Sequence, residues 1–216
     1  MRVYPGDPEV DVAPALTVAR DGVNVLRLHL GSQSGTHVDA PFHVRDDLPR
    51  LDELPLDRFV GPAVLLDARG LPPRAPIGPE RLGPVRSQLA PGVVVLLVTG
   101  WSRHWTDDRY PAHPWPTPEL ARVLVDAGVR TVGIDAQSVD VTPAPGDPDP
   151  GLPTHLVLAA AGCVIAENLT GLEPLLDARS RGTAVEVSLL PLKLAGADGA
   201  PIRAVAHLTP PPPSPS

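Results

Sequence analysis

The residues of this chain that could do chemistry are concentrated in a short segment near the amino terminus. Polar side chains occur there at odd-numbered positions: Gln33, His37, Asp39 and His43. Because alternate residues of an extended chain face the same side, one strand-like run over 33–43 would present all four to one pocket. Imidazole and carboxylate donors without thiolates suit Zn²⁺, Mn²⁺ or Fe²⁺. The segment therefore predicts a metal site; the alternative is a solvated turn with incidental histidines.

A second pair of candidate ligands, His155 and Glu167, lies in the carboxyl-terminal half of the chain. The pattern predicts a short helix over 155–161, capped by Thr154, and then a strand over 163–166. The helix rises about 10 Å. The strand returns over about 13 Å. We therefore expect His155 and Glu167 near the same end of this unit, although many helix–strand units carry a histidine and a glutamate.

Hydrophobic patterns predict alternating strands and helices in the middle of the chain and further strands at both ends. This order indicates an α/β fold with a mixed sheet, in one domain over 1–209. The proline-rich segment 210–216 is expected to be a disordered tail. Strands are expected at 23–30, 63–66, 93–98, 129–134, 163–166, 183–190 and 202–207, and helices at 80–89, 118–127 and 155–161.

Bulk composition narrows the classes of function. The 216 residues are 43% hydrophobic, which suits one domain with a sizeable core. A net charge of −7 with dispersed arginines argues against a nucleic-acid partner. The single cysteine, Cys163, excludes an intramolecular disulfide and a Cys-rich zinc site. The first residues lack the apolar core of a signal peptide, and the longest apolar run, 93–98, is too short for a bilayer, so we expect a cytoplasmic protein without membrane contact.

Several sequence blocks occur in the order in which a known family carries them. They are Tyr-Pro-Gly-Asp at 4–7, Gly-Thr-His-Val-Asp-Ala-Pro-Phe-His at 35–43, Thr-Gly-Trp at 99–101, Gly-Ile-Asp at 133–135 with Ser138 and Asp140, and His155 through Glu167-Asn168-Leu169. These blocks resemble the cyclase family, which includes bacterial kynurenine formamidase. The resemblance spans almost the whole chain apart from the tail. It implies the family's swivelling β/β/α fold, assembled as a homo-oligomer such as a dimer or tetramer.

The resemblance also implies a role for each matching residue. His37 and Asp39 would be metal ligands, with Asp39 able to bridge two ions, and His155 and Glu167 would complete the metal site. One or two divalent ions per chain, zinc or manganese, would activate a water molecule and polarise the substrate carbonyl. His43 would exchange a proton as the tetrahedral intermediate breaks down. The implied activity is hydrolysis of an amide, lactam or ester bond in a small aromatic substrate.

One position departs from the family pattern, because Gln33 stands where the family has a histidine. A glutamine oxygen can bind a metal, but it is neutral and a weaker donor to zinc than imidazole. Three readings follow: one ion instead of two, a harder ion such as Mn²⁺, or a binding protein that has lost turnover. A cyclase or lyase acting on a biosynthetic intermediate is a further alternative.

Aromatic residues are expected at the substrate pocket. The resemblance places Tyr4 there. Trp101, Trp105 and Trp115 form a cluster that would build an apolar wall for a planar substrate, with ordinary loop packing as the alternative. A serine-hydrolase mechanism is unsupported, because Gly-Ser-Gln-Ser-Gly at 31–35 has glutamine where the nucleophile belongs.

Overall fold

The computed structural model describes residues 1–144, 146–148 and 150–211. Four parallel strands form the centre of the main sheet: β4 (Val60–Asp67), β6 (Val94–Val98), β8 (Thr131–Ile134) and β9 (Val164–Glu167). Valine, leucine and isoleucine dominate these strands, as expected where helices or loops cover both faces of a sheet. The four strands predicted in this part of the chain are confirmed, with ends that shift by a few residues.

Antiparallel strands extend the sheet on both sides, in the order β11-β3-β9-β8-β6-β4-β10-β12. These outer strands are β3 (His37–Asp39), β10 (Ala184–Ser188), β11 (Gly199–Pro201) and β12 (Val205–Thr209). β3 pairs with both β9 and β11, so its backbone is held along both edges. The predicted α/β class, the mixed sheet and the swivelling β/β/α fold are confirmed.

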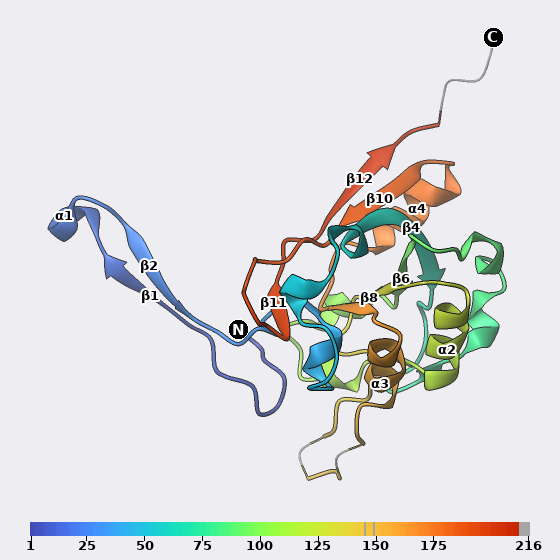
Figure 1. Cartoon of the computed structure of the whole chain (residues 1–216), viewed down its shortest axis with the longest axis horizontal. Coiled ribbons are helices and arrows are strands. Elements are labelled where there is room, and N and C mark those ends of the chain that lie inside the picture. The colour runs from blue at the N-terminus through green and yellow to red at the C-terminus, as the bar shows by residue number, and fades with distance from the viewer. Residues whose placement is uncertain (145, 149, 212–216) are drawn as a thin grey trace.

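Helices lie on both faces of the sheet and cover two hydrophobic cores (Figure 1). On one face pack α2 (Pro118–Asp126) and α3 (Pro153–Ala160), and on the other α4 (Glu173–Ser180). Successive residues of β4 alternate between the two cores: Leu66 lies in the first and Leu65 in the second. The sheet is thus fixed from both sides, which gives the loops at its ends a rigid base.

The structure differs from the predicted helices in two places. The helix predicted over 80–89 is wrong; the segment forms two 3₁₀ turns, Pro79–Leu82 and Arg86–Gln88. The Gly-Pro pair at 83–84 interrupts the run, because glycine is a poor helix former and proline lacks the N–H that an α-helical hydrogen bond needs. Conversely, α4 was not predicted, since few of its eight residues are buried and its hydrophobic period is weak.

Short elements complete the described chain. Other 3₁₀ turns occur at Pro41–His43, Leu51–Glu53, Leu56–Arg58, Trp101–His104 and Tyr110–Ala112. A small parallel sheet joins β5 (Pro76–Ile77) to β7 (Trp115–Pro116). Among the described residues, no helix is both long and apolar enough to cross a membrane. From residue 212 on, the predicted disordered tail lies outside the described residues.

A two-stranded arm projects from the body of the molecule (Figure 1). Its strands β1 (Asp11–Leu16) and β2 (Val25–His29) pair antiparallel, and the short helix α1 (Val18–Asp21) stands at the tip. The strand predicted here is confirmed, but its apolar face lies in solvent: Leu26 and Leu28 are 60% and 61% exposed. The alternation of apolar and polar residues in this segment therefore belongs to an exposed hairpin and does not indicate a strand packed on the core.

Candidate functional site

Strand β3 brings two predicted ligands, His37 and Asp39, to the same face of the sheet. In the antiparallel pairing with β9, His37 stands directly opposite Glu167, so the three side chains meet. The Nε2 atom of His37 lies 3.5 Å from Oδ1 of Asp39 and 3.6 Å from Oε2 of Glu167. All three side chains are buried. A position between two other strands thus gives this part of the site a fixed geometry.

His155 reaches the same cluster from the first turn of α3. Its Nε2 atom lies 3.4 Å from Oε1 of Glu167 and 3.8 Å from Oδ2 of Asp39. The expectation that His155 and Glu167 lie at the same end of their helix–strand unit is confirmed. The predicted cap, Thr154, lies inside the helix instead, and the carboxylate of Asp140 accepts the backbone N–H groups of Thr154 and His155.

Both histidines of the cluster are oriented through Nδ1. In His37 this atom lies 2.8 Å from the carbonyl oxygen of Gly35, and in His155 it lies 2.7 Å from Oδ2 of Asp140. Both partners accept, so Nδ1 carries the proton and each Nε2 can present a lone pair to the cluster. Nε2 of His37 and Oδ2 of Asp39 are buried without a hydrogen-bond partner. This donor set fits a divalent transition-metal ion.

The buried side chains shift one another's pKa values. Burial disfavours the charged form of His37, but the negative charges of Asp39 and Glu167 outweigh it and raise the pKa of His37 to about 9. Burial likewise opposes a charge on His155, but its carboxylate partners raise its pKa well above the usual value. The neighbouring imidazoles of His155 and His37 lower the pKa of Glu167 against the effect of burial. Without a metal, His37 and His155 thus tend to stay protonated, and a bound cation would take the place of these protons.

Two overlapping groups of side chains have ligand atoms within 4.8 Å of one another among the described residues. One group is His37, Asp39 and Glu167; the other is Asp39, His43 and His155. Asp39 belongs to both groups, which is the position that a bridging carboxylate would need. The structure therefore brings together the four ligands that the resemblance implies, with His43 beside them.

The run over 33–43 is not one strand, although its four polar side chains do converge. Residues 37–39 alone are extended as β3, and His43 ends the 3₁₀ turn that follows. The ring centroids of His43 and His155 are 6.0 Å apart. Nδ1 of His43 lies 3.2 Å from Oδ2 of Asp198. That carboxylate fixes the orientation of the His43 ring.

Gln33, from the turn before β3, presents its amide nitrogen to neighbouring carboxylates. The Nε2 atom of Gln33 lies 2.9 Å from Oδ2 of Asp198 and 3.5 Å from Oδ1 of Asp39. Its Oε1 atom lies 2.8 Å from the hydroxyl of Ser32. In this arrangement Gln33 is a hydrogen-bond donor to the site, and its oxygen is not directed at the ligand cluster.

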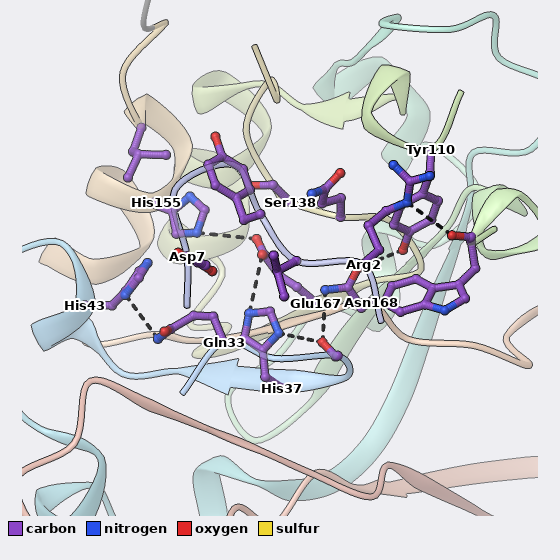
Figure 2. Close-up of a pocket in the computed structure, with 16 residues that line it drawn as sticks. Arg2, Asp7, Gln33, His37, His43, Tyr110, Ser138, His155, Glu167 and Asn168 are labelled. Atoms are coloured by element: carbon purple, nitrogen blue, oxygen red, sulfur yellow. Dashed lines mark hydrogen bonds and ion pairs between the residues drawn. The ribbon is translucent and has the colours of Figure 1, made fainter. Parts of the chain in front are cut away.

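A cavity opens onto the cluster (Figure 2). It encloses about 570 Å³ including its open mouth. The amino-terminal residues Arg2, Tyr4 and Asp7 line it, together with Trp105 and Tyr110. Tyr4 is thus in the wall where the resemblance places it. A lining of aromatic side chains with a few polar groups suits a small molecule.

Trp101, expected in the substrate pocket, is not among the described residues that line the cavity. Its side chain is 4% exposed within the core, and its indole N–H donates to the carbonyl of Tyr110. Trp105 lines the cavity instead, with its ring against that of Tyr110 at a centroid distance of 5.2 Å. Trp101 therefore packs in the core and Trp105 lines the cavity, while Trp115 lies in β7.

Sequence reasoning missed several polar residues at the site, three of which follow. Asp198 comes from the connection before β11, and no local pattern links it to β3. Asp7 belongs to the Tyr-Pro-Gly-Asp block, and that block could have indicated its place in the cavity wall. Burial raises the pKa of Asp7. Gln137 lies beside Ser138, in another of the blocks, and lines the cavity.

Comparisons with known proteins agree with this geometry. The model of the cyclase family ("Putative cyclase") matches residues 1–141. Kynurenine formamidase from Salinibacter ruber is 38% identical, over 97% of this chain and 93% of that protein. A structure described as a predicted metal-dependent hydrolase from Bacillus stearothermophilus has a TM-score of 0.69 at 28% identity, over 94% of this chain and 90% of that one.

The fold has a further match in an isatin hydrolase bound to the product analogue thioisatinate. Its TM-score is 0.82 over 98% of this chain and 87% of that one, at 22% identity, which shows a shared fold. The buried imidazole–carboxylate cluster at the base of a cavity, together with the similarity to kynurenine formamidase, places the chain in a hydrolytic class of enzymes. Within that class, the chain belongs to the cyclase family.

Proposed function

We propose that this enzyme hydrolyses the amide or lactam bond of a small aromatic substrate at a divalent metal centre. The observation that carries the proposal is the convergence of four buried donor side chains beside the cavity, two of which hold orphaned atoms: Nε2 of His37 and Oδ2 of Asp39. An aromatic amide is supported by the names of the kynurenine formamidase and isatin hydrolase to which the chain is similar.

The residues that would hold the ion are His37, Asp39, His155 and Glu167. Zinc or manganese bound there would lower the pKa of a water molecule and polarise the substrate carbonyl. We favour one ion per chain, because Gln33 directs its amide nitrogen, which cannot bind a metal ion, toward Asp39 and Asp198.

His43 is the residue that we assign to proton transfer. It lines the cavity, and its Nδ1 atom is engaged by Asp198, so Nε2 is the ring atom left for exchange with the substrate. Burial opposes a charge on His43, but the hydrogen bond with Asp198 outweighs it and raises the pKa. In amide hydrolysis, the water oxygen bonds to the carbonyl carbon, the C–N bond breaks and the nitrogen takes a proton. His43 would supply that proton.

The arm formed by β1 and β2 supports the proposal of a homo-oligomer. Val12, Leu26 and Leu28 form part of an apolar face on this hairpin, and each is more than half exposed. An isolated two-stranded hairpin is marginally stable in water, so this face needs a cover. On the body of the same chain, the exposed side chains of Leu190 and Leu192 line one surface hollow, so a second copy can supply a cover. We also propose a cytoplasmic location, where the buried free thiol of Cys163 stays reduced.

Turnover of an N-formyl arylamine, with and without a chelator, tests the proposed function. We expect hydrolysis by the purified protein, its loss after chelation and its return with zinc or manganese. Reaction in ¹⁸O-labelled water should place the label in the acid product, which separates hydrolysis from a cyclase or lyase reaction. Full activity in metal-free protein, or an unlabelled product, would refute the proposal.

A further inference from the structure

One buried, unpaired side-chain oxygen belongs to a residue that lines the cavity and is not one of the candidate metal ligands. Gln137 follows β8, its side chain is 5% exposed, and it lines the cavity. Its Oε1 atom is buried without a hydrogen-bond partner. The proposed ion would satisfy the orphaned atoms of His37 and Asp39, whereas Gln137 is not one of its proposed ligands. A buried acceptor without a donor is costly, so its natural complement is a donor on the molecule that fills the cavity.

Hydrogen bonds hold the backbone on both sides of Gln137, so the position of its side chain is fixed by the fold. Just before it, the carboxylate of Asp135 accepts the backbone N–H groups of Thr99 and Gly100, at 2.7 and 2.8 Å. Just after it, the N–H of Val139 donates to Oε1 of Glu167 at 2.7 Å. The last contact ties this loop to a candidate metal ligand, which fixes Gln137 relative to the reacting centre.

Between these anchors, the carbonyl of Ala136 accepts the N–H of Asn168 at 2.8 Å. The loop is therefore held on both sides of Gln137, and a turn of the side chain toward solvent would require the loop to move.

We propose that Gln137 is a specificity residue whose Oε1 atom accepts a hydrogen bond from the N–H of the scissile amide or lactam. The inference rests on the proposed function and narrows it, since an amide carries an N–H where an ester carries an oxygen. The amide, the tetrahedral intermediate and the amine product all keep an N–H, so the contact persists through the reaction. Such a contact acts mainly on binding, and its loss should raise KM more than it lowers kcat.

The test compares two substrates that differ at one atom, formanilide and phenyl formate. In Gln137→Leu, kcat/KM for formanilide should fall about 10- to 100-fold, mostly through KM, with that for phenyl formate within about threefold of wild type. Gln88→Leu is the matched control, because Gln88 is exposed and remote from the cavity. Metal content should be unchanged in both variants. If Gln137→Leu fails to fold, Gln137→Met removes the same acceptor with an unbranched side chain.

Equal losses on both substrates, or no loss on either, would overturn the role of Gln137 while leaving the proposed function intact. Failure of the wild type to cleave either substrate would count against the function itself. Calorimetry with acetanilide and phenyl acetate then decides the inference separately. The wild type should bind the anilide more tightly and Gln137→Leu should lose that preference; an absent preference, or no binding, contradicts the inference.

Discussion

Nδ1 of His155 lies 2.7 Å from Oδ2 of Asp140, and the same carboxylate accepts the backbone N–H groups at the start of α3. One side chain therefore caps the helix and orients a candidate metal ligand. The sequence block at 133–140 does not mark Asp140 as a metal-site residue, yet its contact with Nδ1 makes it the residue that sets the tautomer of His155.

Replacement of Asp140 should weaken metal binding without removing a ligand. In Asp140→Asn, loss of the carboxylate leaves the ring of His155 less firmly oriented and less basic. We expect metal affinity to fall about 10- to 100-fold, measured by competition with a chromogenic chelator. Asp126→Asn, on the exposed side of α2, is the control and should bind as the wild type does. An unchanged affinity in Asp140→Asn would show that the contact serves the helix alone.

His43→Ala should separate catalysis from metal binding. His43 lies beside the cluster and is held by Asp198, so its removal should leave the four ligands in place. We expect kcat to fall about 10²- to 10⁴-fold with unchanged metal content. His207→Ala, at an exposed position on β12, serves as the control. A wild-type rate in His43→Ala would remove this residue from the mechanism.

The metal-free protein should lose stability as the pH rises through about 9. The pKa of His37 is raised from 6.5 to about 9, so its stabilising contribution is complete below pH 6.5 and is lost at alkaline pH. This pKa shift corresponds to a contribution of about 3 kcal/mol to the free energy of unfolding. Glu167 has the opposite sign: its pKa is lowered from 4.5, so its contribution is present above that pH and is lost as the pH falls.

Thermal unfolding against pH tests this linkage. With a chelator present, Tm should be highest between about pH 5 and 6.5 and should drop toward pH 9. With saturating zinc or manganese, the ion replaces the protons and the alkaline drop should shrink. The same alkaline drop in metal-loaded protein would contradict a metal site at His37.

The exposed arm should control the oligomeric state. Leu26→Asp with Leu28→Asp places two charges on the apolar face of β2, where a second copy would cover them. Sedimentation equilibrium should show an oligomer for the wild type and a monomer for this variant. Leu56→Asp, at a position that is 70% exposed on the body, should leave the oligomer intact. If the wild type is a monomer even at high concentration, the arm does not mediate oligomer formation.

The parts of the structure that were predictable are those with a local cause. Buried runs such as 93–98 are strands because their residues are apolar and mostly β-branched. His155 and Glu167 meet because the strand runs back over about the same distance that the short helix covers. The segment 33–43 was assigned the right side chains, but only 37–39 are a strand. Turns bring Gln33 and His43 to the cluster.

The parts that were not predictable depend on distant contacts. Asp198 reaches His43 and Gln33 because β11 pairs beside β3, a register that no local pattern encodes. The alternation in β2 does not reveal whether its apolar face meets the same chain, another copy or solvent. Likewise, Trp101 and Trp105 look alike in sequence, and packing alone assigns one to the core and the other to the cavity.

The central claim is that His37 and Asp39 help to hold a divalent ion, and elemental analysis of the purified protein tests it most directly. We predict one equivalent of zinc or manganese per chain in the wild type, and less than a tenth of that in His37→Ala and in Asp39→Ala. Retention of a full equivalent in both variants, or no ion in the wild type after incubation with either metal, would contradict this account.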